Sequence, residues 1–183
     1  MKNSIIILFV LQLLIACNCK KTAVIKVLKA KDLDSKTMVD PKAIDCPIDG
    51  ICTSKILKDK KMVLKTDDFG RLYYETEQSE LSSVVVYEYK KNNPSGYQDG
   101  NYREEIIFEI KNSDSKLSFK DEALDQSKML FGRHCYCKGQ AGYFAVKKGK
   151  FSFERKNQII HFELDFTITE VPQIITNIRA EIK

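Results

Sequence analysis

Residues 159–169 place the strictest constraint on how this chain can fold, because apolar and polar side chains alternate along them. One side of the segment is apolar (Ile160, Phe162, Leu164, Phe166 and Ile168), and the other is mostly polar (Ile159, His161, Glu163, Asp165 and Thr167). A period of two residues is typical of a strand that packs one face on a core and turns the other to water. We therefore expect His161, Glu163 and Asp165 to be solvated surface residues rather than metal ligands.

β-Prone runs of the same kind recur between residues 45 and 183. They are residues 51–57, 62–65, 71–76, 83–89, 102–110, 117–119, 129–137, 142–147, 150–155 and 173–183. The last run also fits a helix begun by Pro172, but its isoleucines favour a strand because β-branched side chains are costly in helices. Turn residues, including Gly70 with its freedom to take positive φ, separate the runs. We expect an all-β fold, an antiparallel β-sandwich or small barrel of about nine short strands, with one helical turn near residues 122–124.

The N-terminus has the features of an export signal. Lys2 supplies a positive charge, and residues 5–15 are apolar apart from Gln12. At roughly 12 residues, this apolar segment is shorter than the ~20 residues that span a bilayer. A basic tip, a short apolar segment and a small residue before the cut site are typical of a secretory signal peptide.

The signal ends in Leu14-Ile15-Ala16-Cys17, which resembles the lipobox of bacterial lipoproteins. The resemblance implies a signal peptide over residues 1–16 and a mature protein that begins at Cys17, acylated by fatty acids such as palmitate. A tether over residues 17–44 would then precede a single β domain over residues 45–183. Asn18, in place of the Asp that often retains such proteins in the inner membrane, implies the outer membrane, facing the periplasm. A plain secreted cysteine and an uncleaved anchor are the alternatives.

An exported protein is expected to use its cysteines for disulfides. With Cys17 assigned to the lipid, we expect Cys19 to be left over. The disulfide candidates are Cys46, Cys52, Cys135 and Cys137. Alternate residues of a strand lie near the ~7 Å limit for a bridge, which favours crossed pairs over the two local ones. The alternatives are zinc, for which Cys-x₅-Cys and Cys-x-Cys are poor spacings, and free or redox-active thiols.

No residue pattern in this chain indicates catalysis. Only His134 and His161 are available as imidazole bases, and no nucleophile motif or glycine-rich phosphate loop accompanies them. Glu104 and Glu105 are adjacent, so in a strand they face opposite ways and cannot form a paired acid–base site. We therefore expect a protein that is not an enzyme and that has no cofactor or metal. The net charge of +5 comes from scattered lysines, so we expect no nucleic-acid binding.

These observations predict a lipid-anchored binding or structural accessory module of the cell envelope. Its partners would be the membrane, through the lipid, and an envelope protein. Loops at residues 92–101 and 138–143 are the expected contact surface, with Tyr97, Tyr102 and Tyr143 as candidate binding residues. The alternative is a lipocalin-like carrier of a small apolar ligand, which requires a cavity inside a closed barrel.

Overall fold

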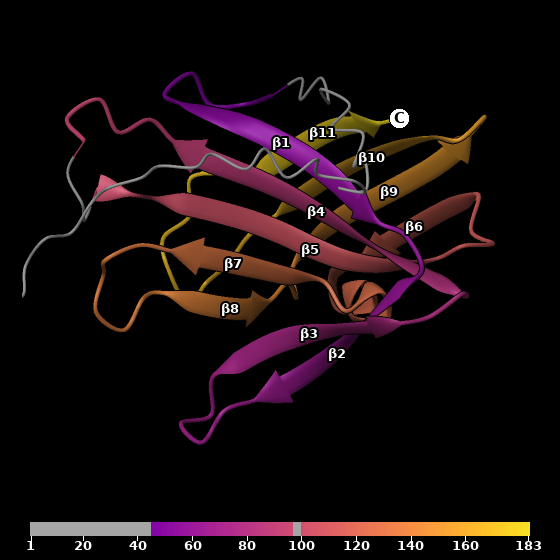
Figure 1. Ribbon diagram of the computed structural model, residues 1–183, viewed down its shortest axis with the longest axis horizontal. Coiled ribbons are helices and arrows are strands. Elements are labelled where there is room, and N and C mark those ends of the chain that lie inside the picture. Colours follow the sequence, from indigo (N-terminus) through magenta and orange to yellow (C-terminus); the bar gives the residue numbers. More distant parts are fainter. Residues whose placement is uncertain (1–44, 97–99) are drawn as a thin grey trace, which may run out of the picture. The chain divides into compact units, whose positions relative to one another are not determined.

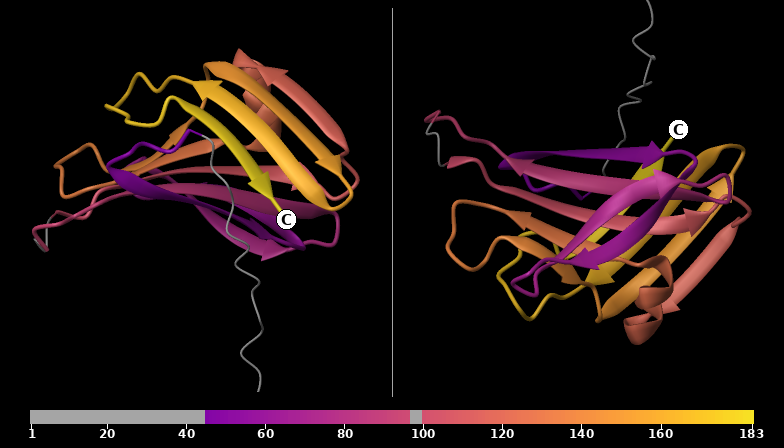
Figure 2. Two further views of the ribbon diagram at one scale, coloured as in Figure 1. Left: turned by 90° about the horizontal axis from the view of Figure 1, so that it is seen from above. Right: turned by 60° about the horizontal axis from the view of Figure 1, so that its bottom comes forward.

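A computed structural model describes residues 45–96 and 100–183, which belong to a compact unit over Thr37–Lys183. The predicted signal peptide, the lipidation site at Cys17, the tether and Tyr97 lie outside the described residues. The described part contains two antiparallel sheets that pack face to face, as the views in Figures 1 and 2 show. The predicted all-β class is confirmed, with a sandwich of two open sheets rather than a closed barrel.

The larger sheet has seven strands in the order β1-β4-β5-β7-β8-β3-β2. They are β1 (Gly50–Leu57), β2 (Lys60–Thr66), β3 (Leu72–Gln78), β4 (Ser82–Lys91), β5 (Arg103–Lys111), β7 (Leu130–His134) and β8 (Gly142–Ala145). The smaller sheet has four strands in the order β11-β10-β9-β6. They are β6 (Lys116–Lys120), β9 (Gly149–Lys156), β10 (Ile159–Phe166) and β11 (Asn177–Ile182). A short 3₁₀ helix, η3 (Asp121–Ser127), follows β6.

The main core lies between the two sheets and is built from alternate residues of each strand. The larger sheet contributes Val85, Tyr87, Tyr89, Ile106, Phe108 and Ile110, and the smaller sheet contributes Phe151, Phe153, Ile160, Phe162, Leu164 and Phe166. The Phe108 ring lies 4.9 Å from that of Phe151 and 5.2 Å from that of Phe162, in edge-to-face contacts that join the sheets. The opposite face of β10 is exposed, as the alternation predicts.

A second, smaller core lies on the other face of the larger sheet. The β2–β3 hairpin covers this face, and Met62 packs there with Val84, Val86, Ile107 and Leu130. Burial on both faces explains why β4 is a nearly continuous apolar run instead of an alternating one.

In addition to its ladder with β3, β2 is held over this second core by two side chains. The Glu109 carboxylate accepts a hydrogen bond from the Met62 backbone N–H at 2.6 Å and from Lys128 Nζ at 2.8 Å. The same Lys128 Nζ donates to the Met62 carbonyl at 2.8 Å. Both outward-facing backbone groups of Met62 are therefore satisfied, which offsets the cost of removing them from water.

The structure corrects the expected strand count and supports most of the boundaries. The described residues hold eleven strands rather than about nine. Gly70 takes φ +75° in the β2–β3 turn, and the predicted helical turn is η3. The C-terminal run is a strand, β11. None of the helices in the described ranges is long and apolar enough to span a membrane.

Candidate functional site

Several connections meet at one end of the larger sheet, which we call the loop end. Strand register brings them together, because Gly50 pairs with Lys91, Arg103 pairs with both Lys90 and His134, and Leu72 pairs with Tyr143. Within the described residues, the loop end therefore comprises residues 45–49, 67–71, 92–96, 100–102 and 135–141. Figure 1 shows the β2–β3, β4–β5 and β7–β8 connections on the same side of the sheet.

Large apolar side chains are exposed at the loop end. Ile48 is fully exposed, and Phe69 and Tyr136 each keep 85% of their surface accessible. Ile51, at the start of β1, is also exposed. Of the other large apolar residues exposed in the described ranges, Leu81 lies in the β3–β4 turn at the opposite end of the sheet. Aromatic side chains are enriched at protein contact surfaces relative to the rest of the protein surface.

The four candidate cysteines form two local disulfides, Cys46–Cys52 and Cys135–Cys137, so the crossed pairing expected from the sequence is wrong. The physical reason is that β7 ends at His134. Cys135 and Cys137 therefore lie in a turn, with their Cα atoms 5.3 Å apart, inside the range that a bridge requires. The Cys46–Cys52 bridge similarly closes the turn that leads into β1, with Cα atoms 5.7 Å apart.

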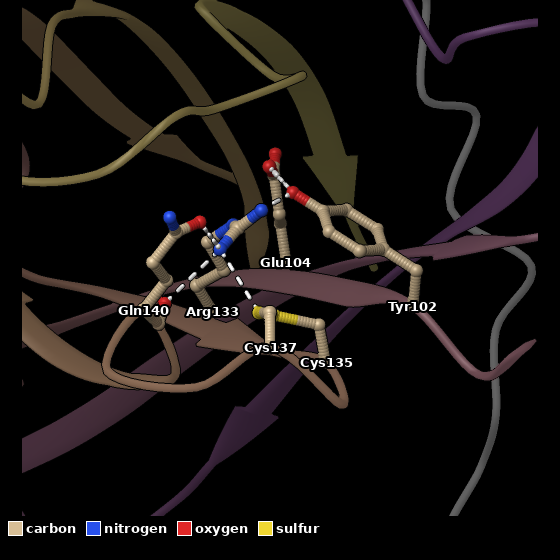
Figure 3. Close-up of a disulfide and its surroundings, with 6 residues drawn as sticks. All are labelled: Tyr102, Glu104, Arg133, Cys135, Cys137 and Gln140. Carbon is tan, nitrogen blue, oxygen red and sulfur yellow. Dashed lines mark hydrogen bonds between the residues drawn. A yellow bond between two sulfur atoms is a disulfide. The ribbon is translucent and has the colours of Figure 1, made fainter. Parts of the chain in front are cut away.

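Arg133, the penultimate residue of β7, organises the β7–β8 loop from beneath (Figure 3). Its side chain donates to Cys137 Sγ at 3.1 Å, to the Gln140 carbonyl at 3.2 Å and to Gln140 Oε1 at 3.0 Å. Its Nε donates to the Tyr102 hydroxyl at 3.2 Å, and the guanidinium lies 5.3 Å from the centre of the Tyr102 ring. Arg133 is only 8% exposed, so a single buried cation fixes both the loop and the ring above β5.

Glu104 is a fully buried carboxylate on the inner face of β5. It accepts hydrogen bonds from the backbone N–H groups of Ile174 and Ile175, at 2.7 and 2.8 Å, and from the Tyr102 hydroxyl. Burial, and then the bond to Glu104, raise the pKa of Tyr102 to about 12. Because Ile174 and Ile175 belong to the β10–β11 connection, Glu104 ties the smaller sheet to the loop end of the larger one.

Glu105 points to the opposite face of β5, as the sequence predicts for adjacent strand residues. His134 Nε2 lies 2.6 Å from its Oε1, and the Tyr143 hydroxyl donates to the same oxygen at 2.8 Å. Burial acts to raise the pKa of the Glu105 carboxyl, but its bonds to His134 and Tyr143 together hold that pKa below its usual value. Gly132 makes room for this cluster, because a Cβ there would lie 2.8 Å from both Glu105 and Tyr143.

A histidine that is hydrogen-bonded to a carboxylate, as His134 is to Glu105, can act as a general base in an enzyme. In the described ranges, however, no serine, threonine or cysteine is bonded to His134, and no group of three or more His, Cys, Asp or Glu is placed to hold a metal ion. His161 is exposed on the outer face of β10 and pairs with Glu181 at 3.5 Å. These contacts give both histidines roles in holding neighbouring side chains.

The binding role expected for the three tyrosines stays a prediction. Tyr102 and Tyr143 are half-buried, and their hydroxyls are committed to Glu104 and Glu105. The role expected for Tyr97 stays a prediction, because this residue lies outside the described ranges.

Sequence reasoning missed Phe69, Tyr136, Arg133 and Gln140 as residues of the loop end. Two signals were available in the sequence. Glu104 stands at an inward position of an alternating strand, and a carboxylate there needs donors. Tyr136 stands between two cysteines, and a disulfide between those cysteines leaves its side chain free to point outward.

A small cleft lies near the opposite end of the sandwich. Its floor includes Ile56, Ile160 and Ile182, with Lys58 and Arg155 also lining it, and its volume is about 270 Å³. Sites for small molecules usually measure about 300–1,000 Å³. This cleft is therefore at or below that lower limit, and the larger hollows of about 330, 510 and 550 Å³ are lined mostly by polar and charged residues.

Comparison with known proteins gives no relative from which a function could be transferred. No protein-family model matches the chain. No curated protein matches it. No solved structure matches it.

Proposed function

We propose that this chain is a lipid-anchored, non-enzymatic binding module of the cell envelope, and that its loop end contacts an envelope protein. The exposure of Ile48, Phe69 and Tyr136 on loops at one end of a rigid sheet is the observation that carries the proposal. Aromatic side chains dominate the energetics of protein contacts, because they bury a large area at low cost in conformational entropy.

The contacts beneath the loop end favour preformed recognition. Arg133 fixes the β7–β8 loop through Gln140, and Glu104 fixes the neighbouring β10–β11 connection. A loop that is ordered before binding loses less entropy when the partner arrives. Tyr136, which stands between Arg133 and Gln140 in the chain, would therefore be presented to a partner at little entropic cost.

The lipid anchor rests on the resemblance of Leu14-Ile15-Ala16-Cys17 to a lipobox. We expect Cys17→Ser to release the protein from membranes or to leave an uncleaved precursor. Cell fractionation with detergent extraction, together with the intact mass of the wild-type protein, measures both effects. An unmodified wild-type mass together with unchanged membrane association of Cys17→Ser would contradict the anchor.

The alternative function, carriage of a small apolar ligand, has weaker support. The sheets do not close into a barrel. The apolar cleft that includes Ile160 is small and lies away from the loop end. A native mass spectrum that shows a lipid bound to the wild-type protein would favour the carrier.

A pair of matched variants tests the loop end directly. We expect the double variant Phe69→Ser/Tyr136→Ser to reduce capture of the envelope partner at least tenfold, because one lost hot-spot contact costs about 2 kcal/mol or more. Leu81→Ser is the control, since Leu81 is 78% exposed but lies in the β3–β4 turn. Quantitative mass spectrometry of crosslinked envelope proteins reports capture, and thermal unfolding should be nearly unchanged in both variants. Equal capture by the double variant and wild type would contradict the proposal.

A further inference from the structure

The two disulfides have different surroundings, although both close short turns. Cys46 and Cys52 pack against the main core, and no described cation donates to either of their sulfurs. Cys137 Sγ instead accepts a hydrogen bond from the Arg133 guanidinium at 3.1 Å. Cys135 and Cys137 also flank Tyr136, whose side chain is exposed on the β7–β8 loop. All four cysteines are half-buried, so the two bridges differ in their neighbours: Cys46–Cys52 packs on the main core, and Cys135–Cys137 lies beside the Arg133 cation and next to the exposed Tyr136.

Arg133 has an unusual charge environment for a buried cation. It is 8% exposed, and no carboxylate lies within ion-pair distance of it in the described part of the chain. Glu104 reaches it only through the Tyr102 hydroxyl. A thiolate at Cys137 would supply the missing direct counter-charge, since a nearby arginine stabilises the ionised form of a cysteine.

The β7–β8 loop has several supports other than its disulfide. β7 and β8 pair from Leu130 with Ala145 to Arg133 with Gly142. Arg133 holds Gln140 by two hydrogen bonds, and the Gln140 N–H donates to the Cys137 carbonyl at 3.1 Å. A bridge between residues two apart also restricts the unfolded chain little, because the loop that it closes is very short. Opening this bond therefore leaves the fold with most of its restraints.

We propose that Cys135–Cys137 is a redox-active disulfide that exchanges with a dithiol of a partner protein. A partner thiolate attacks Cys135 Sγ and forms a mixed disulfide, and the electron pair of the broken bond leaves on Cys137 Sγ beside Arg133. The second partner thiolate then attacks the partner sulfur of the mixed disulfide and releases Cys135. In total the partner dithiol loses two electrons and two protons and becomes a disulfide; Cys135 and Cys137 gain the two electrons, Cys135 takes one proton, and the other proton passes to solvent while Cys137 stays a thiolate beside Arg133.

The first experiment uses the wild-type full-length protein, with dithiothreitol as the dithiol probe. The protein is equilibrated over a series of ratios of reduced to oxidised dithiothreitol, free thiols are alkylated, and each cysteine pair is quantified by peptide mass spectrometry. We expect Cys135–Cys137 to be half-reduced at a ratio at least about tenfold lower than Cys46–Cys52, because charge-assisted hydrogen bonds contribute about 1.5–3 kcal/mol. Reduction of both pairs at the same ratio, or of Cys46–Cys52 first, would overturn the proposal.

The second experiment removes the cation. Arg133→Gln should lower the equilibrium constant for reduction of Cys135–Cys137 at least about tenfold and slow the reaction, because the leaving thiolate loses its partner. Arg133→Lys should retain part of the effect. Arg155→Gln is the control, since Arg155 is part-buried and donates to the Asn112 carbonyl far from the loop. An unchanged equilibrium constant for reduction in Arg133→Gln would refute the role of Arg133. If Arg133→Gln does not fold, the proposal is tested by Arg133→Lys and by the comparison of the two disulfides in the wild-type protein.

Discussion

Replacing Glu104 with glutamine tests whether this buried carboxylate joins the two sheets. The carboxylate is fully buried and accepts from the N–H groups of Ile174 and Ile175 and from the Tyr102 hydroxyl. Glutamine keeps the size of the side chain but offers one acceptor oxygen and an NH₂ group. At least one backbone N–H must then face another donor without a hydrogen bond.

The expected loss of stability follows from these contacts. A buried donor left unsatisfied costs about 1–3 kcal/mol, and the remaining bonds lose the extra strength that the charge gives them. We therefore expect Glu104→Gln to lower the free energy of unfolding by about 3 kcal/mol. For a domain of this size, that corresponds to a fall in Tm of about 10 °C.

Urea denaturation of the full chain measures the effect, with the midpoint lowered and the m value unchanged. Hydrogen exchange should also show faster exchange at the amides of Ile174 and Ile175. Glu163→Gln is the matched control, because the Glu163 side chain is 67% exposed and should change stability by no more than about 0.5 kcal/mol. A loss below about 1 kcal/mol in Glu104→Gln would refute the view that Glu104 holds the β10–β11 connection.

Three further predictions concern other buried or half-buried groups. Glu109→Gln and Lys128→Met should each lower the free energy of unfolding by about 2 kcal/mol, and the double variant by much less than the sum; additive losses in urea denaturation would contradict their coupling. The folded pKa of Glu105 lies below its ordinary value of 4.5, so its contribution to stability is present above that pH and lost as pH falls through the folded value. Glu105→Gln should therefore flatten the acid limb of a stability–pH curve, and an unchanged limb would count against this. Tyr87 and Tyr102 have pKa values raised from 10.0 to about 12, chiefly by burial, so their contribution is intact below pH 10 and lost as pH rises toward 12; absorbance titration that finds every tyrosine ionising at its unfolded pKa would exclude this.

Much of the fold could be predicted because strand signals are local. The alternation over residues 159–169 identifies β10 and its exposed face, and the β-branched run at residues 83–89 identifies β4. The sequence of β4 does not predict which element covers its second face. An apolar run does not specify what covers its second face, and here the cover is the β2–β3 hairpin, which is held by Glu109 and Lys128 from distant parts of the sequence.

The disulfide pairing shows why the candidate site was predicted only in part. The preference for crossed pairs rested on treating Cys135 and Cys137 as residues of a strand. That strand, β7, ends at His134, one residue before Cys135. Strand ends depend on turn geometry and on tertiary contacts such as those of Arg133 with Gln140. Likewise, nothing local to Tyr102 or Tyr143 reveals that their hydroxyls bind buried carboxylates.

The way in which Met62 is held has a consequence for the solubility of the protein. β2 is an edge strand, and an edge with free N–H and C=O groups offers a template on which another chain can add a strand and begin an aggregate. At Met62 both groups are already occupied, by Glu109 and Lys128. The same two side chains that fix the hairpin therefore also protect that position of the edge from intermolecular β-pairing.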